Sequence, residues 1–149
     1  MHDSELMQQA RTAREHAFAP YSDYAVGAAI LTDKGVFTGA NIEVSGRSTS
    51  IHAEMFAVFN AVYAGATEYR TLAVSPKGLT GVAICGLCQH TLAQFTDNLR
   101  ILEDIGDDDP VEYELKELMP RSWFRPTLSG LLSFSHSAIH QVSTGPYAD

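Results

Sequence analysis

The sequence predicts a single domain of the α/β class, with helices packed in layers on a mixed β-sheet. Two observations lead to this prediction. Segments with apolar residues at helical spacing alternate along the chain with short apolar runs typical of buried strands. The 149 residues, 45% apolar and 19% charged, suffice for one ordinary globular core.

The N-terminal half is expected to contain two helices and a hairpin. Pro20 ends the first helix, and Asp33-Lys34-Gly35 forms the turn of the hairpin. The second helix carries only His52, Glu54 and Asn60 as strongly polar residues, which is typical of a buried helix. The expected elements are a helix at 4–18, a loop at 21–24, strands at 25–32 and 36–40, and a helix at 51–64.

The C-terminal half is expected to supply a third helix and three more strands, which makes five strands in all. Cys88, Leu92 and Phe95 fall at i, i+4 and i+7, on one face of a helix that begins near Cys85. The other expected elements are strands at 72–74, 99–102 and 111–115, and a turn or short helix at 117–124. Residues 125–149 are Ser-rich with little periodicity, so we expect one main domain at 1–124 and a C-terminal extension at 125–149 that is either loosely packed or an arm used in assembly.

Composition excludes several classes of partner. The net charge of −8 argues against a nucleic-acid surface, which neutralises phosphates with Lys and Arg. No apolar stretch reaches the roughly 18 residues of a membrane span, and residues 1–5 do not resemble a signal peptide. Two cysteines cannot build a disulfide framework, so a reducing cytoplasm is the expected location.

Two short stretches, His52-Ala53-Glu54 and Cys85-Gly86-Leu87-Cys88, hold the residues suited to a catalytic zinc. On a first helical turn, Cys85 and Cys88 present both sulfurs to the same side, and a helix N-terminus favours the thiolate that zinc binds. His52 adds a neutral nitrogen ligand. At a helix start Glu54 can stand beside the open fourth position as a proton shuttle, whereas in mid-helix its side chain would diverge from that of His52 by about 200°.

Each signal also has a plainer interpretation. The cysteine pair could be a redox pair or a structural zinc knuckle, His52 a hydrogen-bonded core residue, and Glu54 a charge placed for the helix dipole. Their conjunction favours zinc-activated water that attacks an electrophilic carbon while a carboxylate moves protons. The zinc deaminase signature, H-x-E followed by P-C-x-x-C, is met except that Ile84 replaces the proline.

Five stretches in order make the chain resemble the cytidine deaminase family. They are similar to the family patterns PYSxFxVGAA, GxNVE, the zinc-binding and catalytic H/C-A-E, PCGxCRQ and LLPxxF. The corresponding stretches here are residues 20–29 (PYSDYAVGAA), 39–43 (GANIE), 52–54 (HAE), 85–89 (CGLCQ) and 118–123 (LMPRSW).

The resemblance implies a three-layer α/β/α sandwich around a mixed five-stranded sheet. It also implies a hydrolase of pyrimidine salvage, which deaminates cytidine and 2′-deoxycytidine to uridine and 2′-deoxyuridine with release of ammonia. By position, His52, Cys85 and Cys88 would hold Zn²⁺. Zinc-bound water would attack C4 while Glu54 protonates N3 and passes protons to the departing amine.

The resemblance further implies the contacts to the nucleoside. Asn41 and Glu43 correspond to the readers of the sugar hydroxyls, Tyr24 to an aromatic that packs on the nucleoside, and Ala53 to a backbone contact with the base. Asn41 and Glu43 lie two apart in an extended segment, so their side chains point the same way and could bind vicinal hydroxyls. Their plainer interpretation is a turn Asn and a solvated Glu. Short members of the family usually form homotetramers in which neighbouring chains complete each pocket; a dimer is the alternative.

The departures from the family pattern lie around the metal ligands. Short members usually have Cys where His52 stands and Arg where Met55 stands. With His as a ligand the centre is neutral and needs no compensating Arg, so the two changes are consistent with each other. Ile84 and Gln89-His90 also differ from the family's Pro and Arg-Gln. These differences leave two alternative functions possible. The protein could deaminate another aminated heterocycle or a modified nucleoside, or it could be a non-catalytic structural zinc protein with His90 as the fourth ligand.

Overall fold

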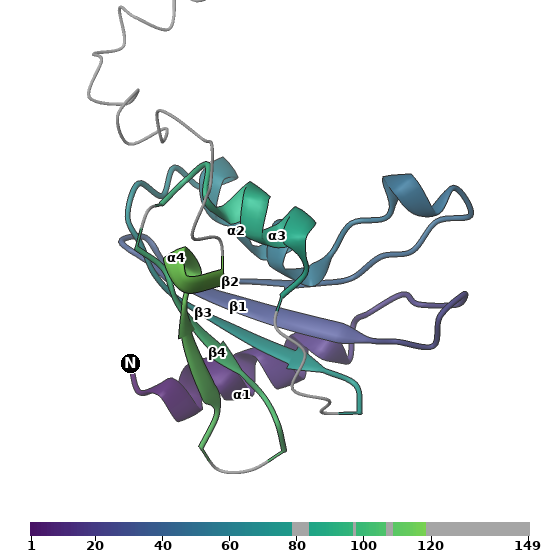
Figure 1. Ribbon diagram of the computed structural model, residues 1–149, viewed down its shortest axis with the longest axis horizontal. Helices are drawn as coiled ribbons and strands as arrows, with labels where there is room; N and C mark the ends of the chain where they lie inside the picture. The colour runs from purple at the N-terminus through teal and green to yellow at the C-terminus, as the bar shows by residue number, and fades with distance from the viewer. Residues whose placement is uncertain (79–83, 97, 107–108, 119–149) are drawn as a thin grey trace, which may run out of the picture.

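A five-stranded sheet with helices on both faces forms the protein in a computed structural model that describes residues 1–78, 84–96, 98–106 and 109–118 (Figure 1). This arrangement confirms the predicted α/β fold. The strands are β1 (Val26–Thr32), β2 (Gly35–Ala40), β3 (Tyr69–Pro76), β4 (Arg100–Glu103) and β5 (Val111–Glu114). The helices are α1 (Asp3–Arg14), α2 (Ala53–Tyr63), α3 (Gly86–Leu92) and α4 (Leu115–Leu118), with a 3-10 turn at Arg47–Thr49.

The sheet is mixed, as predicted. Its strand order is β2-β1-β3-β4-β5, and β1 pairs antiparallel with both β2 and β3. β3 and β4 are parallel, so the chain must cross over between them, and α3 lies in that crossover. α2 and α3 therefore come to lie side by side on the same face of the sheet, opposite α1 (Figure 1).

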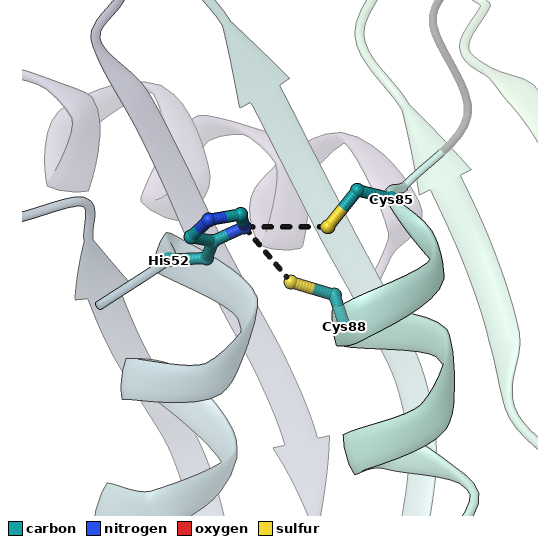
Figure 2. A group of neighbouring side chains, drawn as sticks. All are labelled: His52, Cys85 and Cys88. Carbon is teal, nitrogen blue, oxygen red and sulfur yellow. Dashed lines mark hydrogen bonds between the residues drawn. The ribbon is translucent and has the colours of Figure 1, made fainter. Parts of the chain in front are cut away.

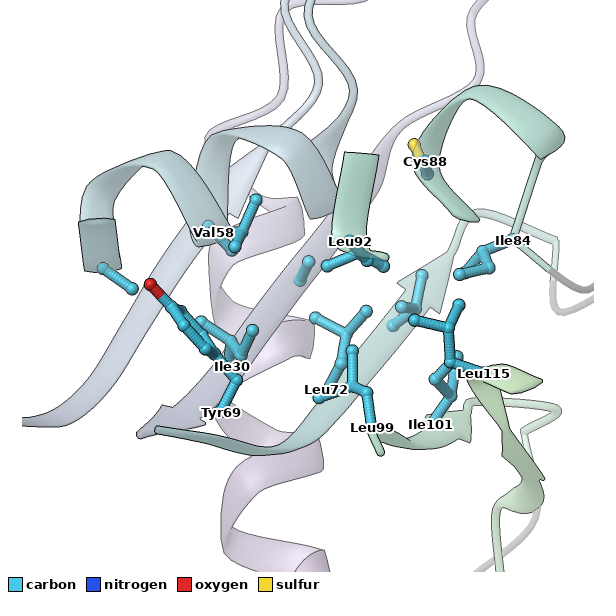
Figure 3. Close-up of a cluster of buried hydrophobic side chains, with 14 of the residues drawn as sticks. Ile30, Val58, Tyr69, Leu72, Ile84, Cys88, Leu92, Leu99, Ile101 and Leu115 are labelled. Carbon is cyan, nitrogen blue, oxygen red and sulfur yellow. The ribbon is translucent and has the colours of Figure 1, made fainter. Parts of the chain in front are cut away.

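The period-two alternation of the strands divides the core into two clusters. In β1, Ile30 belongs to the larger cluster, under α2 and α3, whereas its neighbour Ala29 packs against α1. Figure 3 shows the larger cluster, to which α2 contributes Val58, α3 contributes Leu92 and β3 contributes Leu72. Most of its members are fully buried, so the starts of α2 and α3 rest on a rigid base.

Two predicted helices are shorter than their sequence pattern because backbone pairing competes with helix formation at their ends. α1 ends at Arg14 rather than 18, since Phe18 pairs with Ile42 as an isolated bridge. α2 begins at Ala53 rather than 51, because Ile51 pairs with Ile42 from the other side. Ile42 thus fixes the backbone immediately before His52.

The strands match the predicted ones within a few residues, and β3 is longer at both ends than the predicted 72–74. The predicted domain boundary at 124 and the extension at 125–149 lie outside the described residues, as does most of the predicted turn at 117–124. None of the helices in the described ranges combines the length and apolar character that crossing a bilayer requires.

Gly39 in β2 is required for α2 to lie close to the sheet. A Cβ at this position would stand 2.5 Å from the backbone N of Ala57 and 2.6 Å from the carbonyl O of Ala53. We expect Gly39→Ala to lower the free energy of unfolding by about 3 kcal/mol, since backbone on both sides must shift. Urea denaturation measures the change. Gly46→Ala is the matched control, because its Cβ meets nothing closer than the Thr49 hydroxyl at 3.5 Å, and an equal loss in both variants would contradict the argument.

Glu103, at the end of β4, is a deeply buried carboxyl. Its side chain is 1% exposed, and neither oxygen lies within hydrogen-bond geometry of a partner among the residues that the structure describes. It pairs in register with Val74 and Val111, so its surroundings on the sheet are apolar. Burial raises the pKa of Glu103 above the ordinary 4.5, and the nearby Tyr113 hydroxyl opposes this shift only in part.

We therefore expect Glu103→Leu to stabilise the protein by about 1–3 kcal/mol at pH 7. A raised pKa means that the folded state binds the proton more tightly than the unfolded state does. The wild type accordingly loses stability as the pH rises from 4.5 toward the folded pKa. The gain from Leu should shrink below pH 4.5, which urea titrations at both pH values will show. Exposed Glu15→Leu is the control, and a gain independent of pH would contradict this account.

Candidate metal centre and adjoining pocket

Three side chains converge between the starts of α2 and α3 (Figure 2). The Nδ1 atom of His52 lies 3.3 Å from the Sγ atom of Cys85 and 3.4 Å from that of Cys88. All three atoms lie within 4.8 Å of one another. Cys88 is buried, His52 is partly buried and Cys85 is exposed, so the centre opens on one side.

The convergence follows from where each residue stands relative to its helix. His52 is the N-cap of α2, with extended backbone at φ −86° and ψ 154°, so its side chain does not follow the helical rotation. Glu54 lies in the first turn after it. Cys85 is the N-cap of α3, and Cys88 stands three residues further on, in the first turn. The predicted placement of all four residues at helix starts is what the structure shows.

The donor set fits zinc. Tetrahedral coordination with Zn–S about 2.3 Å and Zn–N about 2.0 Å separates nitrogen from sulfur by about 3.5 Å, close to the two distances here. Without a cation, burial raises the pKa of the Cys88 thiol, and Glu54 and Cys85 raise it further. A divalent cation between the sulfurs reverses this, because its charge stabilises the thiolate. One imidazole and two thiolates leave the centre neutral and a fourth position open.

Glu54 lies in the wall of the same site. Its side chain is 6% exposed, and burial raises the pKa of its carboxyl. Its own backbone N–H, the charge of His52 and a hydrogen bond with Cys88 act in the opposite direction. A carboxyl in this position can exchange protons with a group bound at the open side of the centre.

A cavity of about 360 Å³ adjoins the centre. The residues predicted to bind substrate all line it: Tyr24 and Asn41, Glu43 and Ala53. Tyr24 is 39% exposed at the mouth, whereas Ala53 is fully buried next to His52. The four lie together although they come from the loop before β1, the segment after β2 and the start of α2.

The amide of Asn41 shapes the pocket as well as lining it. Its Oδ1 accepts a hydrogen bond from the backbone N of Val26 at 2.8 Å, and its Nδ2 donates to the carbonyl of Tyr24 at 2.8 Å. Asn41 therefore holds the loop before β1 against the segment after β2. The sequence allowed a turn Asn at this position as well as a binding role, but it did not indicate these two bonds to the loop before β1.

Sequence reasoning did not identify the apolar wall of the pocket. Val26, Val74 and Pro76, from the ends of β1 and β3, form part of it. From the sequence, these residues are predicted only to belong to buried strands. No local sequence pattern distinguishes a strand end that faces a cavity from one that is packed in the core. Ile84 also lines the pocket, and its carbonyl accepts a hydrogen bond from Gln89 Nε2 at 2.5 Å.

His90 does not join the metal cluster. Among the residues with described positions, the cluster able to hold a metal consists of His52, Cys85 and Cys88. His90 follows Cys88 by two positions on α3, which turns its side chain well away from the first-turn cysteine. The geometry thus gives no support to a closed four-ligand centre.

A family model agrees with this picture. The model of the cytidine and deoxycytidylate deaminase zinc-binding region matches residues 1–102, more than half of the chain. Among curated proteins, the cytidine deaminase of Sporosarcina psychrophila is 33% identical over 83% of this chain and 93% of its own length. That of Halalkalibacterium halodurans is 35% identical over 77% of this chain and 89% of its own length.

Solved structures show the same fold. The crystal structure of cytidine deaminase from Burkholderia pseudomallei superposes with a TM-score of 0.78 at 31% identity, and covers 83% of this chain and all of that one. The cytidine deaminase from Mycobacterium tuberculosis gives a TM-score of 0.72 at 29% identity, with 83% of this chain and 99% of that chain covered.

Proposed function

The chain belongs to the cytidine deaminase family and is thus a zinc-dependent hydrolytic deaminase. On this basis we propose that it converts cytidine and 2′-deoxycytidine to uridine and 2′-deoxyuridine, with release of ammonia. One observation carries the proposal. Glu54 is buried beside the His52, Cys85 and Cys88 centre, at the inner end of a cavity large enough for a nucleoside.

The proposed mechanism assigns the proton transfers to Glu54. Zinc, when bound by His52, Cys85 and Cys88, lowers the pKa of a water and so supplies the nucleophile for C4 of the base. Glu54 accepts the proton of this water and delivers it to N3. The same carboxyl then takes the proton of the hydroxyl formed at C4 and delivers it to the amino group, so that the C4=O bond forms as the C4–N bond breaks and ammonia leaves. Ala53, fully buried beside Glu54, offers its backbone to the base.

The pocket chemistry favours a nucleoside over a nucleotide. We assign the sugar hydroxyls to Asn41 and Glu43, and the exposed face of the nucleoside to Tyr24. No Lys or Arg is present among the described residues that line the pocket, so a 5′-phosphate would lack a counter-charge there. The Glu43 carboxylate would in addition repel it.

A substrate panel tests the proposal. Zinc-loaded protein is incubated with cytidine, 2′-deoxycytidine, deoxycytidine monophosphate, cytosine and guanine, and ammonia release is measured. We expect turnover of the two nucleosides and little of the others. Absence of nucleoside turnover would refute the proposal, and a preference for the monophosphate or a free base would refute the sugar-reading roles of Asn41 and Glu43.

A second candidate, deamination of a different aminated heterocycle or a modified nucleoside, has one observation in its favour. Ile84 presents a larger side chain to the pocket than the proline of the zinc deaminase signature, next to the ligand Cys85. Turnover of a modified or non-cytosine base faster than that of cytidine, in the wild type but not in Ile84→Pro, would favour this candidate.

We also propose that the chain assembles with copies of itself, as a tetramer or else a dimer. Apolar side chains lie exposed in the region of the pocket: Tyr21 and Val44, which line the pocket, are 55% and 39% exposed, and Phe18, whose carbonyl accepts a hydrogen bond from the backbone N of Glu43, is 59% exposed. A neighbouring copy would bury them. Light scattering after size exclusion measures the mass. Because free Cys85 and Cys88 must stay reduced to bind zinc, we place the reaction in the cytoplasm, as a step of pyrimidine salvage.

A further inference from the structure

The loop before β1 orients the carboxylate of Glu43. The Oε2 atom accepts hydrogen bonds from the backbone N of Tyr21 at 2.9 Å and of Ser22 at 3.1 Å. The Oε1 atom accepts a hydrogen bond from the Ser22 hydroxyl. Two adjacent residues thus hold both oxygens of one side chain, although they precede it by about twenty positions in the sequence.

The Ser22 hydroxyl has its direction set by a second bond. Its oxygen accepts a hydrogen bond from the backbone N of Tyr24 at 3.0 Å while its hydrogen points to Glu43. A hydroxyl has a single hydrogen to donate and two lone pairs that accept. Here the hydrogen is donated to Glu43, and one lone pair accepts the bond from the backbone N of Tyr24. Ser22 therefore couples the carboxylate of Glu43 to the backbone of Tyr24, and all three residues line the pocket.

The backbone bonds alone leave part of the carboxylate geometry undetermined. Both backbone donors act on Oε2, so the plane of the carboxylate can still rotate about that anchored oxygen. The hydroxyl bond at Oε1 restricts this rotation. A carboxylate held in one orientation before binding loses less conformational freedom when it accepts hydrogen bonds from a ligand, which improves affinity.

We propose that Ser22 is a positioning residue for sugar recognition, whose hydroxyl orients the Glu43 carboxylate toward the hydroxyls of the nucleoside sugar. This inference rests on the proposed function, in which Glu43 reads those hydroxyls. It differs from a purely structural role for Ser22 in one respect: removal of the hydroxyl should matter only for ligands that carry the sugar hydroxyls.

The first experiment compares cytidine with 2′,3′-dideoxycytidine, which lacks both ring hydroxyls. We expect Ser22→Ala to raise KM for cytidine about tenfold, the value of one charge-assisted hydrogen bond, with kcat changed less than about twofold. For dideoxycytidine, kcat/KM should be the same in Ser22→Ala and the wild type. Ser22→Thr retains the hydroxyl and should restore the wild-type KM.

A double-mutant cycle identifies the residue through which Ser22 acts. In a Glu43→Ala background the Ser22 hydroxyl has no carboxylate to orient, so Ser22→Ala should leave KM for cytidine unchanged. Ser48→Ala is the matched control, because the exposed Ser48 hydroxyl, in the region of the 3-10 turn, donates to the carbonyl of Gly46 at 2.8 Å rather than to Glu43. It should have wild-type kinetics on both substrates.

The possible outcomes separate the two proposals. Equal losses on cytidine and dideoxycytidine would show a structural role for Ser22 and overturn the inference. Additive effects of Ser22→Ala and Glu43→Ala would mean that Ser22 contacts the sugar itself, and would also overturn it. An unchanged KM in Ser22→Ala, with normal wild-type turnover, refutes the inference alone. If the wild type turns over neither nucleoside, the proposed function fails and this inference fails with it.

Discussion

Glu54→Gln should lower kcat for cytidine by about 10³- to 10⁴-fold while zinc stays bound. The amide has nearly the shape of the carboxyl, so the buried site at the start of α2 should keep its packing. It cannot, however, accept and release a proton at neutral pH, and general acid–base catalysis by a positioned group contributes a factor of this size. Steady-state kinetics measure the loss, and metal analysis of the same samples measures the zinc.

The zinc measurement makes the kinetic result specific. Glu54→Gln with a normal zinc content separates loss of proton transfer from loss of the metal. Glu68→Gln is the matched control, because this side chain is exposed and lies away from the pocket lining. If Glu54→Gln retained turnover within about tenfold of the wild type, Glu54 would not be the group that moves the protons, since such groups contribute 10² or more.

The elements of the fold could be predicted because their signals are local. The turn at Asp33-Lys34-Gly35 and the apolar run that forms β1 depend on neighbours in sequence, and both are confirmed. The ends of α1 and α2 could not be predicted, because a backbone bridge from Ile42 competes with the helix at each. That bridge forms only in the folded protein. The burial of Glu103 could not be predicted for the same reason, because it depends on β3 and β5 lying on either side of β4.

In the candidate site, too, features that depend on residues close in sequence could be predicted, and features that join distant segments could not. His52 and Glu54, like Cys85 and Cys88, lie within one helical turn of each other, so spacing alone indicated that each pair could act together. The bonds from the loop at 21–24 to Glu43 and Asn41 join segments distant in sequence, and no pattern in either segment indicates them. The sequence therefore predicted the metal centre well and the sugar end of the pocket only by resemblance.

The architecture explains why the two helix starts meet. β3 and β4 are parallel and are joined by a crossover, and α3 in that crossover lies on the face that α2 also covers. Both helices begin at the same end of the sheet, where β3 finishes in the pocket wall at Pro76. Gly39 allows α2 to lie close enough for His52 to reach the two sulfurs. The centre thus depends on the sheet topology as much as on its own three residues.

Cys88→Ala should abolish zinc binding, because the open catalytic site needs all three protein ligands. We expect less than about one tenth of an equivalent of zinc per variant chain, compared with about one equivalent per wild-type chain. Turnover of cytidine should fall by about 10³-fold or more, since water without the metal is far less acidic. Stability should fall as well. Cys88 is fully buried, and the wild type gains folding free energy from a metal that binds only the native state.

His90→Asn, on the same helix, is the matched control, and it distinguishes an open catalytic centre from a closed structural one. In the open centre His90→Asn retains zinc and turnover, because the ligand cluster does not include His90. In a closed centre it would lose the metal as Cys88→Ala does. A chelator should inactivate the wild type and added zinc should restore it, whereas Cys88→Ala should recover nothing. Full activity of Cys88→Ala, or of the chelated wild type, would contradict a catalytic zinc at this position.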